Sequence, residues 1–220
     1  MSTARIARSL RAYDCARPLV VNGPGRDMNE PPTDALKIHM LVHAAPGARG
    51  GVVMCGGARG GTRGPAGIYE PLAVRLQQAG VTSIRLDYRW PNRLAVCVHD
   101  VMTVINNLEQ QGVERVVLIG WSFGGAVVIG AGMASERVVG VATIASQTSG
   151  ADMVAELAPR SLLLLHGTAD ETLSDVCSRV LFSAAGDPKE LVLYPDDNHG
   201  LTHHAADVLE KLYAWSVAML

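Results

Sequence analysis

The chain has 220 residues, of which 48% are hydrophobic and 18% charged, so its composition is that of a globular protein and excludes a disordered one. This length fits one domain better than two. The 19 Lys and Arg residues nearly balance the 21 Asp and Glu residues, which leaves a formal net charge of −2. Without an excess of positive charge, neither nucleic acid nor an anionic membrane is an expected partner.

Residues 1–34 are expected to form an N-terminal arm and loop ahead of a single domain at residues 35–220. Arginines lie among Ser, Thr and Ala before the first acidic residue, at Arg5, Arg8 and Arg11. This pattern is faintly like an organellar transit peptide, but the long apolar run of a secretion signal is missing. The segment from Asn22 to Thr33 is rich in Pro and Gly and is predicted to be a loop.

From Leu36 onward, short β-branched or Leu-rich runs alternate with amphipathic stretches, which predicts a mostly parallel sheet with helices on both faces. The predicted strands are Leu36 to Val42, Gly51 to Cys55, Thr82 to Asp87, Arg115 to Gly120, Val138 to Ala145, Leu162 to His166 and Glu190 to Tyr194. The predicted helices are Ile68 to Ala79, Leu94 to Gln111, Gly124 to Ala134, Ser174 to Ala185 and His203 to the C-terminus.

The uncharged segment from Val116 to Ser135 is long enough to resemble a membrane-spanning helix. Five glycines interrupt it, however, so we interpret it as a buried strand, a turn and a helix, and expect no membrane association. The cysteines are widely spaced and form no CxxC pair: Cys15, Cys55, Cys97 and Cys177. Reduced thiols in a cytoplasmic protein are the simplest interpretation.

The strongest motif is Gly120-Trp121-Ser122-Phe123-Gly124, a GxSxG sequence between a predicted strand and a predicted helix. A sharp strand-to-helix turn would lift the serine hydroxyl above the sheet, and the flanking glycines would avoid clashes in the crowded backbone. The helix N-terminus beneath the serine favours developing negative charge. The motif and its context predict that Ser122 is a nucleophile.

An acid and a histidine follow in the order that such a nucleophile requires, each just beyond the end of a later strand. Asp170 follows the strand that ends at His166, and His199 lies on the loop after Tyr194. His199 would then be the general base, and Asp170 would fix its tautomer.

Neighbouring residues offer alternatives to this assignment. Asp196 or Asp197 could replace Asp170 as the acid, although both lie on the histidine's own loop. His203 and His204 compete with His199 for the role of base. Together with His199 they could also bind a metal ion, but no matching acid or cysteine cluster supports zinc, so no metal is expected.

An oxyanion hole needs two backbone N–H donors, one of them from the residue after the nucleophile, Phe123. The second should come from the glycine-rich loop after the strand that ends at Cys55, from Gly57 or Ala58. This loop lacks the Lys of a phosphate-binding loop and has no GxGxxG sequence, so nucleotide binding is weakly supported and no cofactor is expected.

Arginines and tryptophans near these loops are candidate substrate-binding residues: Arg59, Arg89, Trp90 and Trp121. Arg59 and Arg89, with nearby Arg63 and Arg93, would lie at the carboxyl edge of the sheet, where open α/β folds bind ligands. They are either solvated surface residues or recognise a carboxylate or phosphate on the substrate.

The strand order, the turn around Ser122, Gly167 to Asp170 and Asn198 to Gly200 resemble the α/β-hydrolase superfamily over nearly the whole chain from Leu36. The short sequence between Ala145 and Ser161 resembles compact, lidless members, such as dienelactone-hydrolase-like and small carboxylesterase-like proteins, and leaves no room for a large cap domain. Dienelactone hydrolases proper have a cysteine in place of Ser122, so their reaction is not carried over. Many esterases have a histidine in place of Cys55.

The resemblance implies a hydrolytic scaffold without naming a substrate. The complete Ser-His-Asp set favours a serine hydrolase that cleaves a small soluble ester through an acyl-enzyme. A peptidase or acyl thioesterase with the same triad and a non-catalytic binding protein of the same fold are the alternatives.

Overall fold

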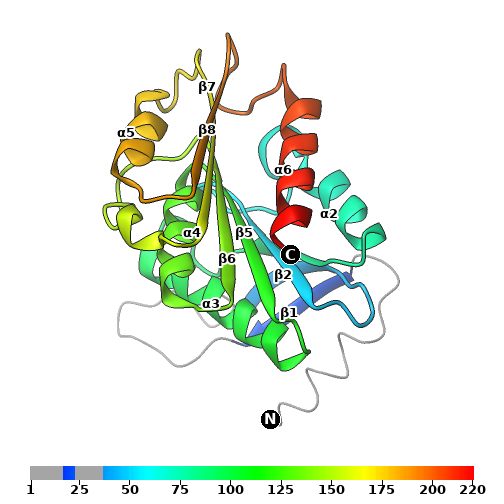
Figure 1. The fold of residues 1–220 in the computed structure, drawn as a ribbon. Coiled ribbons are helices and arrows are strands. Elements are labelled where there is room, and N and C mark those ends of the chain that lie inside the picture. Colours follow the sequence, from blue (N-terminus) through cyan, green and yellow to red (C-terminus); the bar gives the residue numbers. More distant parts are fainter. Residues whose placement is uncertain (1–16, 23–36) are drawn as a thin grey trace.

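The computed structural model describes residues 17–22 and 37–220, which form an eight-stranded sheet in the order β1-β2-β4-β3-β5-β6-β7-β8 (Figure 1). The two pairings that involve β2, with β1 and with β4, are antiparallel, and all the others are parallel. The strands are β1 (Arg17–Asn22), β2 (Lys37–His43), β3 (Gly50–Cys55), β4 (Thr82–Asp87), β5 (Arg115–Trp121), β6 (Val138–Ile144), β7 (Ser161–Gly167) and β8 (Lys189–Tyr194).

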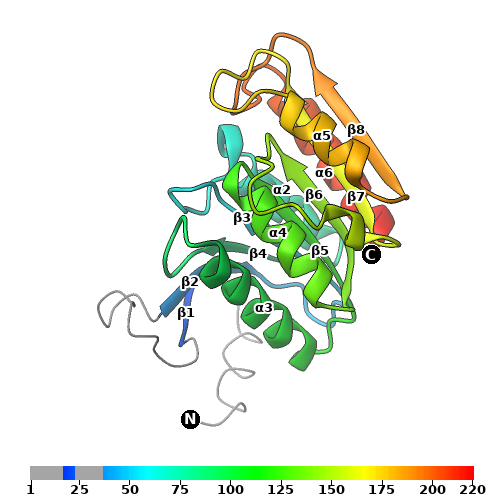
Figure 2. The same ribbon diagram turned by 90° about the vertical axis from the view of Figure 1, so that its left-hand side faces the viewer.

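Five α-helices within the described ranges cover the two faces of the sheet (Figures 1 and 2). One face is covered by α2 and α6, and the other by α3, α4 and α5. Their bounds are α2 (Tyr69–Gln78), α3 (Leu94–Gln110), α4 (Phe123–Ala134), α5 (Val176–Ala184) and α6 (Ala205–Met219). The predicted fold class, a mostly parallel sheet between two helical layers, is confirmed.

The central strand β5 explains the long apolar run in the sequence. Val116 and Leu118 point into the core beneath α3 and α4, whereas Val117 and Ile119 point into the core beneath α2 and α6. A strand buried on both faces needs apolar residues at every position. The uncharged segment is therefore β5 joined to α4. Nowhere in the described part of the chain is a helix both long enough and apolar enough to cross a membrane.

Every predicted strand and helix agrees with the structure to within two residues at each end, whereas β1 is a strand that the sequence did not predict. Residues 17–22 belong to the segment predicted to be an arm and loop, yet they form this edge strand. Its formation depends on pairing with β2, which no local periodicity reveals. The rest of the predicted loop, the three N-terminal arginines and Cys15 lie outside the described residues, and the domain boundary at residue 35 stays a prediction.

The topology brings two loops together at the carboxyl end of the sheet. The chain passes from β3 to β4 on one side and then returns to β5 on the other, so β3 and β5 are parallel neighbours, with Cys55 opposite Gly120. Ligand sites in open α/β sheets form at such a reversal of strand order. Between β6 and β7 the chain forms only a short 3-10 helix, η3 (Val154–Leu157), so the prediction of no large cap domain is confirmed.

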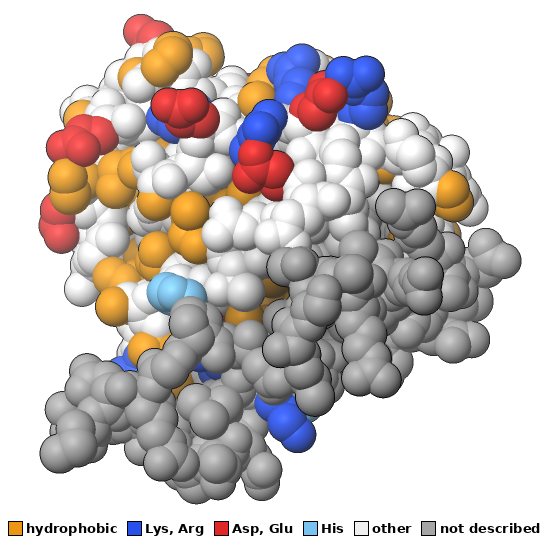
Figure 3. Space-filling model, turned by 90° about the horizontal axis from the view of Figure 1, so that it is seen from below, with side chains coloured by type: hydrophobic (Ala, Val, Ile, Leu, Met, Phe, Trp, Pro, Cys, Tyr) orange, Lys and Arg blue, Asp and Glu red, His pale blue; other side chains and the backbone are white. Residues whose placement is uncertain are grey.

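The opposite end of the molecule carries basic side chains next to acidic ones (Figure 3). Arg49 pairs with Glu114, and Arg137 pairs with Glu109. These partners are well exposed to solvent, so each pair contributes little to stability.

Candidate active site

Ser122 lies in a strained turn between β5 and α4. Its backbone has φ 58° and ψ −121°, a conformation that side-chain-bearing residues rarely adopt. The Ser122 N–H donates to the Ile144 carbonyl at 2.8 Å, and the Ser122 carbonyl accepts from the Gly125 N–H at 2.9 Å. The hydroxyl makes no capping hydrogen bond to α4. The hydroxyl is thus not used to cap the helix, which is consistent with the strand-to-helix turn predicted from the GxSxG sequence.

Close backbone approaches explain two glycines of the motif. A Cβ on Gly120 would lie 2.1 Å from the Gly124 carbonyl oxygen, and a Cβ on Gly124 would lie 2.4 Å from the Gly56 carbonyl oxygen. No side chain fits at either position without moving backbone. The second contact joins the turn directly to the glycine-rich loop after β3.

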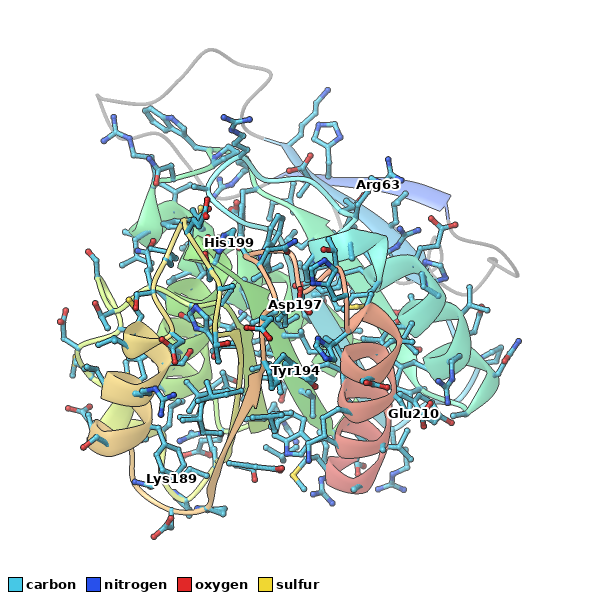
Figure 4. All side chains as sticks on the ribbon, turned by 90° about the horizontal axis from the view of Figure 1, so that it is seen from above. Arg63, Lys189, Tyr194, Asp197, His199 and Glu210 are labelled. Carbon is cyan, nitrogen blue, oxygen red and sulfur yellow. The ribbon has the colours of Figure 1, made fainter. Side chains whose placement is uncertain are left out.

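His199 is hydrogen-bonded to Asp170 (His199 is labelled in Figure 4). The distance from His199 Nδ1 to Asp170 Oδ2 is 2.7 Å, the imidazole is 19% exposed and the carboxylate is fully buried. Asp170 Oδ1 accepts from the backbone N–H groups of Thr172 and Leu173 at 2.8 and 2.9 Å. A carboxylate only accepts, so Nδ1 of His199 carries the proton and Nε2 is left to accept one.

Trp121 connects the nucleophile turn to the histidine loop. Its indole Nε1 donates to the His199 carbonyl oxygen at 3.0 Å, and the two rings lie 5.5 Å apart between centroids. The residue before Ser122 therefore fixes the backbone of His199. No hydrogen bond joins Ser122 Oγ to His199 within residues 37–220, so a proton transfer between them belongs to the mechanism proposed below.

The alternative acids and bases have other partners. Asp197 is buried and accepts from the backbone N–H groups of Asn198, His203 and His204 and from His204 Nδ1, at 2.9 to 3.2 Å. His203 is two-thirds exposed, and its Nδ1 lies 3.3 Å from the Asp196 carbonyl oxygen. The geometry thus favours Asp170 and His199. The described residues include no group of three His, Cys, Asp or Glu side chains arranged to hold a metal ion.

Asp197 should make stability depend on pH in acid. Burial by itself raises the pKa of this carboxyl, but the hydrogen bonds from His204, His203 and Asn198 outweigh burial and hold the pKa below its ordinary value of 3.8. This contribution to stability is fully present above 3.8 and is lost as pH falls from there through the folded-state value. Urea unfolding across this window should show a smaller loss for Asp197→Asn than for the wild type. An equal loss would contradict the prediction, and the exposed Asp152→Asn serves as control.

The predicted oxyanion donors lie next to Ser122. Phe123 is the first residue of α4, so its N–H has no partner within the helix. A Cβ on Gly57 would lie 3.5 Å from Ser122 Cβ, which places the loop backbone against the nucleophile. Ala58, the next residue, is exposed. Gly57 and Ala58 both stay candidates for the second donor.

Three side chains that the sequence did not reveal hold the glycine-rich loop after β3 in place. Tyr69 Oη donates to the Cys55 carbonyl at 3.0 Å, and Tyr88 Oη donates to the Gly56 carbonyl at 3.1 Å. Asp87 Oδ1 accepts from the Gly61 N–H at 2.7 Å. Asp87 and Tyr88 stand at the end of β4, the strand beside β3. Their place at the end of a strand could have marked them as candidate site residues, but the sequence does not show which loop they contact.

The candidate substrate-binding arginines differ in their exposure to solvent. The Arg89 side chain is 7% exposed, and its Nε donates to the buried Asp100 at 2.5 Å. This guanidinium is therefore buried and already paired. Burial raises the pKa of Asp100, and the bonds from Arg89 oppose that rise. The Trp90 ring is covered by Arg93 at 4.6 Å. Arg59 and Arg63 are exposed. Because Arg89 is paired with Asp100, it is disfavoured as a ligand for substrate. The exposed Arg59 stays the candidate for this role.

A curated bacterial protein matches part of the chain. The chain is 29% identical over 171 residues to the uncharacterized protein YfhR of Escherichia coli, an alignment that covers 63% of this chain and 60% of YfhR. The chain thus aligns with less than two thirds of the length of these curated relatives. No family model matches.

Two solved structures show the same fold. A dienelactone hydrolase from Anabaena variabilis superposes with a TM-score of 0.73 at 18% identity, covering 92% of this chain and 99% of that one. A serine hydrolase without a lid from Xanthomonas campestris gives a TM-score of 0.71 at 18% identity, covering 92% and 94%. The chain therefore has the α/β-hydrolase fold and resembles its compact, lidless members.

Proposed function

We propose that this protein is a serine hydrolase that cleaves small soluble carboxylic esters, with Ser122 as nucleophile, His199 as general base and Asp170 as the acid that orients the base. One observation carries the proposal. The Asp170–His199 hydrogen bond is tied through Trp121 to the strained turn that presents Ser122. A binding protein of this fold has no need for that arrangement.

In the proposed reaction, Ser122 Oγ attacks the ester carbonyl carbon and its proton passes to His199 Nε2. The carbonyl oxygen becomes an oxyanion, stabilised by the N–H of Phe123 and by that of Gly57 or Ala58. His199 then gives the proton to the departing alcohol, which leaves an acyl group on Ser122. A water molecule, deprotonated by His199, releases the acid and restores the serine. Asp170 stabilises the imidazolium in both steps and takes no proton itself.

Labelling with a fluorophosphonate probe tests this mechanism, because the probe phosphonylates activated serines. Labelling should map to Ser122 and require a folded protein. Wild-type protein that neither reacts with the probe nor hydrolyses short acyl esters would overturn the proposal. A screen of esters, thioesters and aminoacyl amides then separates an esterase from a thioesterase or peptidase.

A cytoplasmic location remains part of this proposal. It rests on the absence of cysteine pairing motifs, and Cys55, Cys97 and Cys177 are free thiols within the described residues.

Arg59 is expected to recognise an anionic group on the substrate. It is exposed two residues beyond Gly57, whose backbone lies against Ser122, and a planar guanidinium suits a carboxylate or phosphate. Arg59→Ala should raise KM for esters of dicarboxylic acids on the order of tenfold and leave neutral esters nearly unchanged. Arg49→Ala, at the other end of the molecule, is the matched control. Equal effects on charged and neutral esters would leave Arg59 as a surface residue.

A further inference from the structure

Asp170 contacts a second histidine that the mechanism above does not use. His166 lies in β7, is completely buried, and points its Nε2 at two oxygens. The Leu173 carbonyl oxygen lies 2.9 Å from Nε2, and Asp170 Oδ2 lies 3.2 Å from it. The same Oδ2 accepts the hydrogen bond from His199. One carboxylate oxygen thus lies between two imidazoles.

The partners of His166 fix where its proton is. A backbone carbonyl and a carboxylate can only accept, so Nε2 must carry the hydrogen and share it between them. The other ring nitrogen, Nδ1, lies 2.7 Å from the hydroxyl of Ser178, which is buried in α5. A hydroxyl both donates and accepts, so Ser178 Oγ can pair with this nitrogen with or without a proton on it. The Leu173 and Asp170 oxygens therefore require the proton on Nε2, and the contacts at the two ring nitrogens together hold the plane of the His166 ring.

We infer that His166 is a positioning residue that keeps Asp170 Oδ2 directed at His199, an inference that rests on the proposed function. The two backbone N–H groups on Oδ1 hold one side of the carboxylate, and the His166 N–H holds the other. His166 also fixes the Leu173 carbonyl, so it anchors the turn that supplies the Leu173 N–H to Asp170. His166 restricts rotation of the carboxylate without contacting substrate.

The proton on Nε2 is the part of His166 that this role requires, and two amide substitutions separate it from the rest of the ring. In glutamine the side-chain nitrogen is as many bonds from Cα as Nε2 of histidine. In asparagine the nitrogen corresponds to Nδ1 instead. His166→Gln therefore keeps a donor for Asp170 and Leu173, whereas His166→Asn keeps a partner for Ser178 only. Both variants replace a buried imidazole with a neutral amide, so they are matched for the loss of the ring.

We expect His166→Asn to lower kcat by roughly 10- to 100-fold with KM nearly unchanged, because displacing a catalytic group by about 1 Å costs on this order. His166→Gln should recover most of the activity. The acid limb of the pH profile of kcat/KM should also shift in His166→Asn and not in His166→Gln. Only His166→Asn removes the donor that holds Asp170 Oδ2, so only this variant changes the hydrogen bond between Asp170 and His199. Equal activity in the two variants, or a full-activity His166→Asn, would overturn the inference.

Nitrogen-15 NMR of the imidazoles in the wild-type protein keeps the test decisive if either variant fails to fold. His166 should carry a proton on Nε2, the nitrogen that faces Asp170 and Leu173. A proton on Nδ1 alone, with Nε2 unprotonated, would overturn the inference, because Nε2 could not then donate to Asp170. An inactive wild-type protein would count against the proposed function, whereas an active one with the wrong His166 tautomer would count against this inference alone.

Discussion

Ser122→Ala is expected to remove nearly all ester hydrolysis while leaving the fold intact. Loss of the nucleophile in such a site lowers kcat by about four to six orders of magnitude. The fold should survive because the Ser122 hydroxyl caps no helix, and because alanine at φ 58° is strained to a similar degree as serine. Initial rates with a short acyl ester, together with a thermal melt, measure both outcomes.

A matched control separates the nucleophile from a general effect of losing a hydroxyl. Ser149→Ala, at an exposed position outside the turn, should have wild-type activity and stability. A Ser122→Ala protein that still hydrolyses the ester would refute the mechanism. A Ser122→Ala protein that no longer melts cooperatively would show that the loss of activity reflects unfolding.

His199→Ala is expected to be similarly inactive, again by about four to six orders of magnitude in kcat, because the proposed mechanism transfers the Ser122 proton to the His199 imidazole. The Trp121 indole donates to the backbone carbonyl of residue 199, and this bond survives truncation of the side chain. The loop should therefore keep its path, so the loss can be assigned to the imidazole. Single-turnover kinetics would show that acylation itself has failed.

The two neighbouring histidines provide the controls. His203→Ala removes an exposed ring and should change neither activity nor stability appreciably. His204→Ala should retain most activity but lose stability by about 1–3 kcal/mol, because the buried Asp197 carboxylate loses its bond from the ring. An active His199→Ala protein combined with an inactive His203→Ala protein would mean that the base is assigned to the wrong residue.

Local patterns in the sequence were sufficient to predict seven of the eight strands, the helices and the chain order of the three candidate site residues. The apolar runs at residues 116–119 of β5 and 162–165 of β7 are visible without tertiary information, because the central residues of a strand buried on both faces are mostly apolar. The GxSxG turn is just as local, since a strained strand-to-helix connection needs glycine wherever backbone passes close by, as at Gly120 and Gly124. For the same reason Ser122, Asp170 and His199 could be named from their places after strand ends.

Apart from the Asp170–His199 pair, the partners of these residues could not be predicted, because they come from contacts between segments distant in sequence. Asp170 was preferred to Asp197 from its place after a strand end, and the packing of β7 beside β8 brings Asp170 to the imidazole of His199. From the sequence, Arg89 was either a solvated surface residue or a ligand for substrate, whereas the fold buries it against Asp100.

The sequence by itself therefore determined the fold class and indicated the candidate site residues, since both depend on periodicity and on the chemistry of short motifs. The tertiary structure alone decided that β1 joins the sheet edge, that Trp121 ties the Ser122 turn to the His199 loop, and that His166 shares Asp170 with the base. The physical reason is that a hydrogen bond needs its two atoms within about 3 Å, and separation along a chain does not set that distance.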